Sequence, residues 1–585
     1  MYCPECGHKI EDTSMRFCPE CGTKLEESVI PEGKSEGSSA GDQKEDSAET
    51  VYGIIFTNLN LLAGKLRSDI RTVTEMLWTF IDQRELSGVR YKLIDAGNYT
   101  FTKSGIFSRS RTVSLNASSP VTDYLEILMN VHDMEEKEGG AVSDYLFIIG
   151  GTDIIPMPHI KHYFAENSSD KTIDTDLLYA YPYNNAMISA LEDMEAFGYE
   201  QLFYVGRLPL GEDAIIKDLA GYLQRVLDSS GTIDIGESYG QCDPNWKKVS
   251  ASVASELIGN GFMRNLDGRL SDEYYFSRLI LSPMVTKDTV NQVLHTGADL
   301  YYFNLHGGSG AESRGFFGAA TPQYGGRFYT AILPEHMMTL EKHNAVISEA
   351  CYGGKFIGLD KRRSMLLASI FSNTLIFVGS SRIAYGAVDT TTTSDHCRLN
   401  AADVIAHVFI SSALEGYDAG QSLQIARCTL LQKCGWGDPY AALTITEFNL
   451  FGDPAVLMHG HGRTNGKTAF KMAEKSAIAP KGTKKDTCRI EDVGTGGSPG
   501  SILVQVRGEV DTNIMDIHAK ISGYLYANYS VKPRKLDSAF RLKYESGKEE
   551  IMFNYKFPAN TEGIETQYTV CVTADGEIQN VFTTK

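Results

Sequence analysis

A cysteine and a histidine each follow a short apolar segment that is rich in strand-forming residues. The segment DLYYFNL is followed by His306, and the segment NAVISEA is followed by Cys351, 45 positions after the histidine. A thiolate can attack a peptide carbonyl, and a nearby imidazole can favour the thiolate or handle the proton of the leaving group. The two residues therefore predict nucleophilic chemistry, with Cys351 as the nucleophile and His306 as the acid and base.

Glycines accompany both residues. His306 precedes Gly307 and Gly308, and Gly353 follows two positions after Cys351. Backbone N–H groups in such loops can approach the oxygen that becomes negative during acyl transfer. We expect the N–H groups of Gly307 and Cys351 to form this oxyanion hole. The alternative, a buried structural cysteine and a core histidine, is less consistent with the strand context and the paired glycine loops.

The elements that must position these residues follow an alternating strand and helix pattern from Val51 to about residue 460. The expected strands are Val51–Thr57, Arg90–Asp95, Tyr145–Gly150, Leu202–Gly206, Asp299–His306, Ala345–Cys351 and Thr374–Gly379. The expected helices between them are Asp69–Arg84, Val121–Glu135, Glu212–Leu227, Lys247–Ile258 and Ala401–Leu414. This order predicts an α/β fold with a mostly parallel sheet and helices on both faces. Ligands and catalytic groups collect at the carboxyl ends of such strands, so His306 and Cys351 should lie on neighbouring loops.

We expect this region to form two sub-units, 51–230 and 231–460, which fit the pattern better than one sheet. The sequence SSG at Ser229–Gly231 interrupts the pattern and marks the break. After a Gly-, Lys- and Ser-rich linker, 461–500, the pattern changes to strands alone, with His518–Tyr526 among them. Short, regularly spaced strands predict a small β-sandwich over 501–585.

The N-terminus carries a duplicated motif, CPECGHK and CPECGTK. Two Cys-x-x-Cys pairs of this kind can close one tetrahedral zinc site, with the ligands Cys3, Cys6, Cys18 and Cys21. A redox pair would instead need a thioredoxin-like setting, which a segment this short cannot supply. We therefore predict a structural zinc ribbon over 1–26, followed by a flexible acidic linker over 27–50.

The composition limits the partners. The 585 residues include 55 Lys and Arg against 74 Asp and Glu, a net charge of −19, which argues against a broad nucleic-acid surface. No apolar run is long enough to span a membrane, and no export segment is recognisable at the N-terminus. The dispersed cysteines indicate reduced thiols. We expect a cytoplasmic protein with no membrane partner and no cofactor in catalysis.

The segment Glu349 to Gly353 resembles the caspase signature Q-A-C-x-G, with Glu in place of Gln. The chain as a whole, from about residue 51 to 460, resembles the gingipain family of caspase-fold cysteine peptidases. The motifs that carry the resemblance occur in the same order, and they are IIGGTDIIP (Ile148–Pro156), TDLLYAY (Thr175–Tyr181), FYVGRLP (Phe203–Pro209), LHGGSG with His306, EACYGG with Cys351 and FNLFGDPAVLM (Phe448–Met458).

The resemblance implies a caspase-like fold, catalysis by His306 and Cys351, and an immunoglobulin-like sandwich after the peptidase. It also implies that Asp243 binds an Arg or Lys at P1 and that Tyr385 forms a wall of that pocket. A helix cap or a turn before Pro244 explains Asp243 equally well, and packing is an alternative for Tyr385. Two features depart from the family: the sequence has His-Gly-Gly where the family has His-Gly-Ser, and it lacks a recognisable export signal.

A third catalytic group would orient the imidazole. Glu237 could accept a hydrogen bond from the second ring nitrogen of His306, with Glu312 and Asp153 as competitors. The sequence thus predicts an intracellular cysteine endopeptidase that acts on polypeptides, cleaves after Arg or Lys, and stays latent until it is triggered. A regulatory protein would bind the zinc ribbon. The alternative is a catalytically inert scaffold that binds partners through the ribbon and the β-sandwich.

Overall fold

The computed structural model describes the central part of the chain and most of the C-terminal part. The described residues are 50–101, 111–161, 172–182, 201–254, 257, 275–276, 279–282, 285–291, 298–310, 314–319, 328–342, 344–388, 399–434, 438–460, 488–495, 505–506, 509–510, 512–529, 533, 536–544, 549–557, 566–573 and 576–584. The predicted zinc ribbon, with Cys3, Cys6, Cys18 and Cys21, lies outside them.

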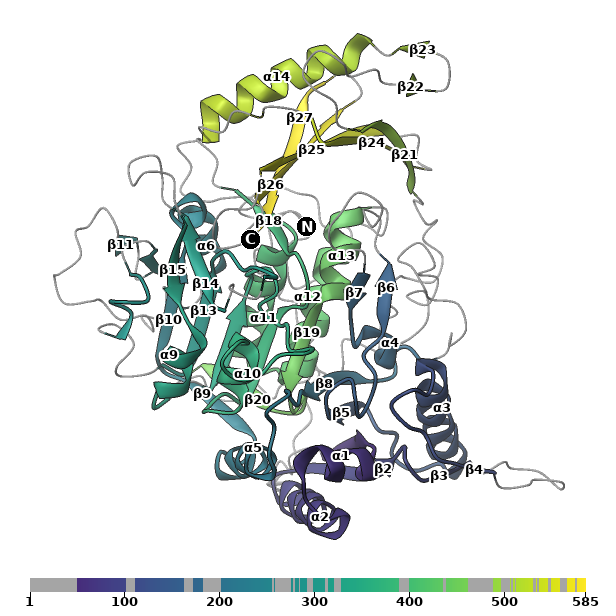
Figure 1. Cartoon of the computed structure of the whole chain (residues 1–585). Helices are drawn as coiled ribbons and strands as arrows, with labels where there is room; N and C mark the ends of the chain where they lie inside the picture. Colours follow the sequence, from purple (N-terminus) through teal and green to yellow (C-terminus); the bar gives the residue numbers. More distant parts are fainter. Residues whose placement is uncertain are drawn as a thin grey trace, which may run out of the picture.

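An 11-stranded sheet forms the centre of the molecule (Figure 1). Its order is β11-β12-β10-β13-β16-β17-β19-β8-β5-β1-β2. The bounds are β1 (Val51–Thr57), β2 (Val89–Asp95), β5 (Tyr145–Ile149), β8 (Tyr204–Leu208), β10 (Ser238–Cys242), β11 (Tyr275–Phe276), β12 (Leu279–Leu281), β13 (Leu300–Asn304), β16 (Ala345–Ser348), β17 (Ile376–Ser380) and β19 (Phe448–Gly452). The central strands are buried throughout, as expected for a sheet that is covered on both faces.

The sheet consists of two parallel blocks that run in opposite directions. Strands β12, β10, β13, β16 and β17 are parallel to one another, and so are β19, β8, β5, β1 and β2. The blocks meet where β17 pairs antiparallel with β19. The expected separation into two sub-units is therefore corrected: there are two blocks, but β19 joins them into one continuous sheet. The predicted break at Ser229–Gly231 falls just after the helix α5 (Ile216–Asp228), where Ser230 and Gly231 both have positive φ.

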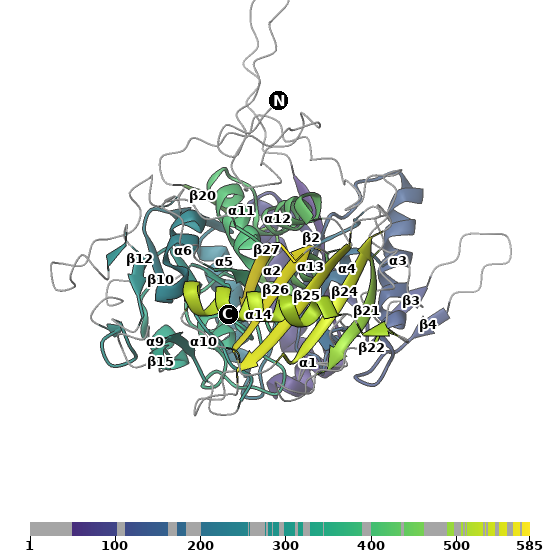
Figure 2. The ribbon, with the colours of Figure 1, turned by 90° about the horizontal axis from the view of Figure 1, so that it is seen from above.

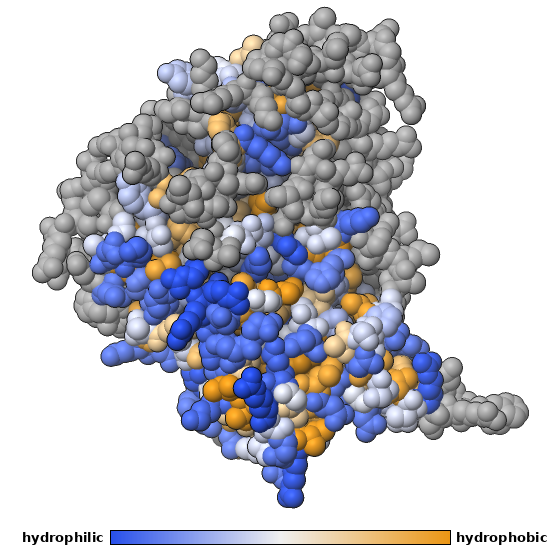
Figure 3. Space-filling model, viewed as in Figure 1, coloured by the Kyte–Doolittle hydropathy of each residue, from blue (hydrophilic) through white to orange (hydrophobic). Residues whose placement is uncertain are grey.

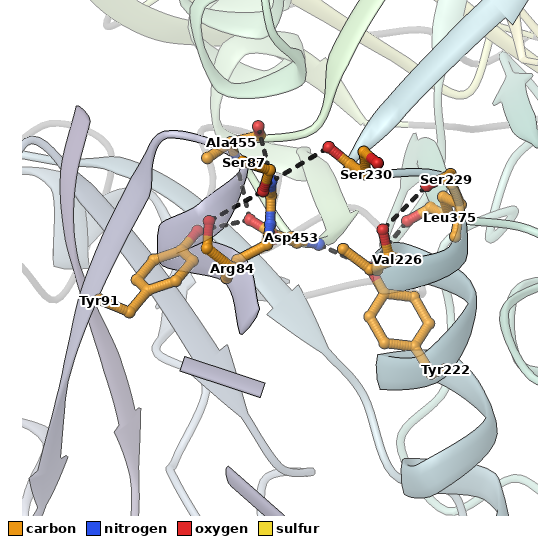
Figure 4. A network of polar contacts seen from close by, with 10 residues as sticks. All are labelled: Arg84, Ser87, Tyr91, Tyr222, Val226, Ser229, Ser230, Leu375, Asp453 and Ala455. Carbon is orange, nitrogen blue, oxygen red and sulfur yellow. Dashed lines mark hydrogen bonds and ion pairs between the residues drawn. The ribbon is translucent and has the colours of Figure 1, made fainter. Parts of the chain in front are cut away.

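A buried polar network holds the two blocks together (Figure 4). Arg84, from the helix before β2, forms an ion pair of 3.2 Å with Asp453, which follows β19, and donates to the carbonyl of Ala455. Tyr222 accepts from the N–H of Asp453 at 2.7 Å and donates to the carbonyl of Leu375, just before β17, at 2.9 Å. Gly231 is required here, since a Cβ would lie 2.2 Å from the guanidinium of Arg84.

Helices cover both faces of the sheet. Seen from above, α11 and α12 lie on one side and α9 and α10 on the other (Figure 2). Polar side chains cap several of these helices. Asp69 accepts from the N–H of Thr72 at 2.8 Å, and Asp438 accepts from the N–H groups of Tyr440 and Ala441 in the first turn of the helix that follows it. The bounds are α1 (Leu59–Leu66), α2 (Ile70–Leu86), α3 (Val121–Glu138), α4 (Leu177–Ala180), α5 (Ile216–Asp228), α6 (Lys247–Val253), α9 (Pro334–Thr339), α10 (Met365–Ile370), α11 (Ala402–Leu414), α12 (Ala419–Cys434) and α13 (Pro439–Glu447).

Short strands form small hairpins and pairs around the main sheet. They are β3 (Tyr99–Phe101) with β4 (Arg111–Val113), β6 (His159–Lys161) with β7 (Thr172–Asp174), β9 (Thr232–Ile235) with β20 (Leu457–Gly460), β14 (Phe316–Ala319) with β15 (Phe328–Ile332), and β22 (Gln505–Val506) with β23 (Glu509–Val510).

The C-terminal part is not a β-sandwich in the described residues. It is a six-stranded sheet of order β18-β27-β26-β25-β24-β21, and the helix α14 (Thr512–Tyr529) lies across it (Figure 1). The predicted strand His518–Tyr526 lies within this helix, and Ile517, Ile521 and Leu525 pack against the sheet with the spacing of one helix face. The strand bounds are β18 (Tyr385–Ala387), β21 (Cys488–Thr495), β24 (Ser538–Tyr544), β25 (Glu549–Phe557), β26 (Thr566–Thr573) and β27 (Ile578–Thr584). Since β21 lies in the predicted linker 461–500, that linker is shorter than expected.

Among the coloured residues of the face shown in Figure 3, hydrophilic areas alternate with smaller hydrophobic ones. Trp78 and Leu86 of α2 are among the large hydrophobic side chains that solvent reaches. Among the helices of the described ranges, none combines the length and the apolar character that a membrane crossing requires.

Candidate active site

His306 follows the carboxyl end of β13 and is fixed by the neighbouring hairpin. Its N–H donates to the carbonyl of Phe317 in β14 at 2.8 Å, and the N–H of Phe317 donates back at 2.8 Å. The imidazole lies between two aromatic rings, with centroids 4.5 Å from Trp246 and 4.7 Å from Phe328. These contacts restrict the ring to a narrow range of orientations, as a proton-transfer group requires.

Asp243 lies beside this imidazole. It follows β10, which is parallel to β13 and pairs with it residue for residue, so both chains leave the sheet at the same edge. Its Oδ2 is 3.6 Å from Nε2 of His306, and its side chain has no exposed surface. The other carboxylate oxygen accepts from the N–H of Asn245 at 2.8 Å and caps the short helix that begins at Pro244. Asp243 thus caps the turn at Pro244 and not the expected helix from Lys247, whose first cap residue is Trp246, and the same carboxylate also faces His306.

Glu237 does not lie near His306. It precedes β10, and its carbonyl accepts from the N–H of Asp299 at 2.9 Å, at the start of β13. Because β13 has five residues, this end is about 16 Å from the histidine end at about 3.3 Å per residue. The predicted orienting role of Glu237 is therefore wrong. Its competitor Asp153 forms an ion pair of 2.8 Å with Lys65, and Glu312 is outside the described residues.

Cys351 follows β16 at the start of a tight turn. The next residue, Tyr352, has φ of 57°, a left-handed conformation that is uncommon for a bulky side chain and is concentrated at functional sites. The N–H of Tyr352 donates to the carbonyl of Arg382 at 2.7 Å. The Sγ of Cys351 lies 3.5 Å from the carbonyl oxygen of Ala384. The loop that leads from β17 to β18 therefore forms one wall around the thiol.

The histidine loop and the cysteine loop touch each other. A Cβ on Gly307 would lie 1.7 Å from the carbonyl oxygen of Cys351, so only glycine allows the two backbones to come this close. Strands β13 and β16 are adjacent and parallel, which brings both loops to the same edge of the sheet. The prediction that His306 and Cys351 lie on adjoining loops is confirmed. The glycine is needed for this contact, whichever N–H groups bind the oxyanion.

Tyr385 begins β18, one residue after Ala384. Its ring packs against Tyr440 of α13, with centroids 4.9 Å apart. The residue is 5% exposed, as is typical of packing, and it lies close to the thiol through its chain neighbour. The packing alternative for Tyr385 therefore agrees with the structure.

The sequence analysis did not identify the two aromatic residues that flank the His306 ring. Phe328 comes from a hairpin whose pairing with the histidine loop depends on tertiary structure. Trp246 follows Asp243 by three positions, and an aromatic residue this close to a candidate site residue was a signal that could have been used. Arg382, whose carbonyl binds the turn after the thiol, forms an ion pair of 2.7 Å with Asp174 of β7.

The chain has clear similarity to known families. The sequence model of peptidase family C25 matches residues 116–459, and that of a zinc-ribbon domain matches residues 2–25. No curated protein matches the sequence.

Three of the solved structures that match the chain have low sequence identity and TM-scores below 0.5. The Arg specific cysteine proteinase gingipain R has 11% identity and a TM-score of 0.42, and the match covers 92% of this chain and 92% of that one. A structure described as a protease has 10% identity and a TM-score of 0.40, with 91% and 96% covered. The separase-securin complex of Saccharomyces cerevisiae has 9% identity and a TM-score of 0.29, with 55% and 16% covered.

Proposed function

The chain belongs to peptidase family C25, and we propose that it is a cysteine endopeptidase in which Cys351 and His306 carry out the reaction. The observation that carries the proposal is the contact between the two loops at Gly307, which places the histidine and the cysteine at the same edge of the sheet.

In the proposed reaction, the Cys351 thiolate attacks the carbonyl carbon of the scissile bond. The carbonyl oxygen becomes negative, and N–H groups of Gly307 and Cys351 stabilise it. The C–N bond then breaks, and protonated His306 gives its proton to the leaving amine. A water molecule attacks the resulting thioester while His306 takes its proton. The C–S bond then breaks, which releases the carboxylic acid product and regenerates the Cys351 thiolate beside protonated His306.

Asp243 serves as a positioning residue in this proposal. Its buried carboxylate lies at Nε2 of His306, so Nδ1 is the nitrogen that exchanges protons with the substrate. A buried negative charge at this distance stabilises the imidazolium that forms when the thiolate forms. The 3.6 Å separation is longer than a normal hydrogen bond, as is common in a site without substrate.

We further propose that the substrate carries Arg or Lys at P1. The net charge of −19 favours the approach of basic peptides. In this scheme the carboxylate of Asp243 acts on His306, so its part in recognition of P1 must be tested separately.

The zinc ribbon is proposed to hold a structural zinc ion through Cys3, Cys6, Cys18 and Cys21. Four thiolates suit zinc, and the ion would fold a segment that is too short for a core of its own. We propose that this ribbon binds a regulatory protein and that the enzyme acts inside the cell, where the dispersed cysteines would remain reduced.

A panel of fluorogenic peptides that differ at P1 tests the proposal. Hydrolysis by the wild-type chain and none by Cys351→Ala or His306→Ala is expected. Failure of the wild type on every peptide, after Cys351 has been shown to react with an alkylating reagent, would leave the inert scaffold as the better description.

Asp243→Asn separates positioning from recognition. A positioning residue predicts that kcat falls on all peptides by about 10²-fold or more, with little change in KM. If kcat on a neutral P1 peptide is kept and only the preference for Arg or Lys is lost, Asp243 belongs to the substrate pocket instead.

A further inference from the structure

We propose that strand β27 closes the candidate active site and must leave β18 before a polypeptide can reach Cys351. The inference concerns regulation of the same site and rests on the proposed function.

Strand β27 pairs with β18, the strand that begins beside the thiol of Cys351. The pairing is antiparallel, with Tyr385 opposite Thr584 and Ala387 opposite Phe582. Ala384, whose carbonyl oxygen lies 3.5 Å from Sγ of Cys351, directly precedes this pairing. In Figure 1 the C-terminal sheet accordingly stands at the end of the main sheet where β18 lies.

The edge of β18 would suit an extended peptide. Extended peptides commonly bind by adding a strand to a sheet edge, with main-chain hydrogen bonds that do not depend on sequence. One edge of β18 is occupied by β27, and at the other edge Gly386 forms a bridge with Ala401. A substrate strand that pairs here must therefore replace β27.

The C-terminal sheet also packs on the main body with one of its faces. Side chains alternate along the strands: Ile551, Phe553 and Val570 face α14, whereas Met552 and Phe582 pack into the core of the main body. The ring of Phe582 stacks on Tyr440, with centroids 4.5 Å apart and an angle of 21°.

Tyr568 of β26 links the C-terminal sheet electrostatically to the candidate active site. Burial raises the pKa of Tyr568 in β26, and the nearby negative charge of Asp243 raises it further. A side chain of the C-terminal sheet thus lies within electrostatic range of the carboxylate that faces His306. With this sheet in place, Cys351 and His306 are each only 4% exposed, which is too little for a peptide to reach the thiol.

The C-terminal unit can leave without unfolding. It has a hydrophobic core of its own between α14 and the sheet, with Ile521, Leu525 and Phe553 among its members. Among the described residues, its strand contact with the main body is limited to the three residue pairs between β27 and β18. The side chains that it adds to the core of the main body are few, Met552 and Phe582 among them. The unit therefore keeps a core of its own when this interface opens.

The variant Phe582→Ala tests the closure, with Ile578→Ala as the matched control. Both residues lie in β27, but Phe582 belongs to the core of the main body, whereas Ile578 packs against the core of the C-terminal unit. The first readout is the rate at which iodoacetamide alkylates Cys351, followed by mass spectrometry of the peptide that contains it. The second readout is hydrolysis of the fluorogenic peptides. Circular dichroism checks that both variants are folded.

We expect Phe582→Ala to raise the alkylation rate and the hydrolysis rate by about 10- to 100-fold, as for a closed state whose open form is populated at about 1 to 10%. Ile578→Ala should change neither rate by more than about twofold. If alkylation rises and no peptide is cleaved, the closure holds and the proposed function is wrong. If peptides are cleaved but neither rate responds to Phe582→Ala, the function holds and the closure is wrong.

The wild-type chain provides a measurement that does not depend on the folding of a variant. A bulky maleimide on Cys351 cannot fit while β27 is in place, so labelling should increase hydrogen exchange in residues 578–584. Labelled protein in which these amides stay as protected as before would overturn the closure.

Discussion

The contact between Gly307 and Cys351 allows the sharpest test of the site. In Gly307→Ala, the new Cβ would lie 1.7 Å from the carbonyl oxygen of Cys351, whereas ordinary van der Waals contact begins at 3.4 Å. The two loops must therefore separate by roughly 1 to 2 Å. A misplacement of about 1 Å between reacting groups costs about 10²-fold in rate, and the strain costs about 1 to 3 kcal/mol of unfolding free energy. The N–H of residue 307 remains, so the loss would come from geometry alone.

The assay is kcat/KM on the best fluorogenic peptide, together with the midpoint of thermal unfolding. Gly64→Ala is the control, because no atom lies within 4 Å of its added Cβ and alanine is favoured in a helix. The control should keep full activity and gain slightly in stability. If Gly307→Ala has wild-type activity and an unchanged unfolding midpoint, the two loops do not form the contact described above.

Three further outcomes are expected. Arg84→Met leaves the carboxylate of Asp453 buried without its ion pair and should lower the free energy of unfolding by about 3 to 5 kcal/mol in urea titrations, while Arg71→Met, which breaks an exposed pair, should change it by no more than about 0.5 kcal/mol. Burial raises the pKa of Asp418 from 3.8 to about 7, so the folded state holds a proton that the unfolded chain releases above pH 3.8; the stability from this group is full below that pH, falls as the pH rises to about 7 and is constant above, and Asp418→Asn should flatten this part of the pH profile by a few kcal/mol, roughly. Metal analysis should find zinc that a chelator removes, and Cys18→Ser should lower its content; a wild-type chain without zinc would contradict the ribbon proposal.

Much of the fold could be predicted because the buried strands are short apolar runs bounded by turns. Strand β1 has its predicted bounds, and β5, β13 and β16 differ from theirs by one to three residues at their ends. The position of His306 and Cys351 followed from the same pattern, since parallel neighbouring strands deliver their following residues to one edge.

The carboxylate that lies beside His306 could not be predicted from the sequence in the same way. Glu237 and Asp243 flank the same strand, β10, and only its direction and register against β13 decide which of them meets His306. The antiparallel pairing of β17 with β19 and that of β18 with β27 also join residues that lie far apart in the chain, so the order of the elements in the sequence did not reveal them. The error over α14 was avoidable, because Ile517, Ile521 and Leu525 recur every four residues, a spacing that indicates a helix.

The opposed directions of the two parallel blocks have a consequence for how this peptidase can be altered. Residues that follow β1, β5 and β8 lie on the rim far from the thiol, whereas those that precede β5, β8 and β19 share its rim. New loops that are grafted after β5 should therefore leave the rate of substrate turnover unchanged, whereas loops that are grafted before β8 should change the substrate preference of the enzyme.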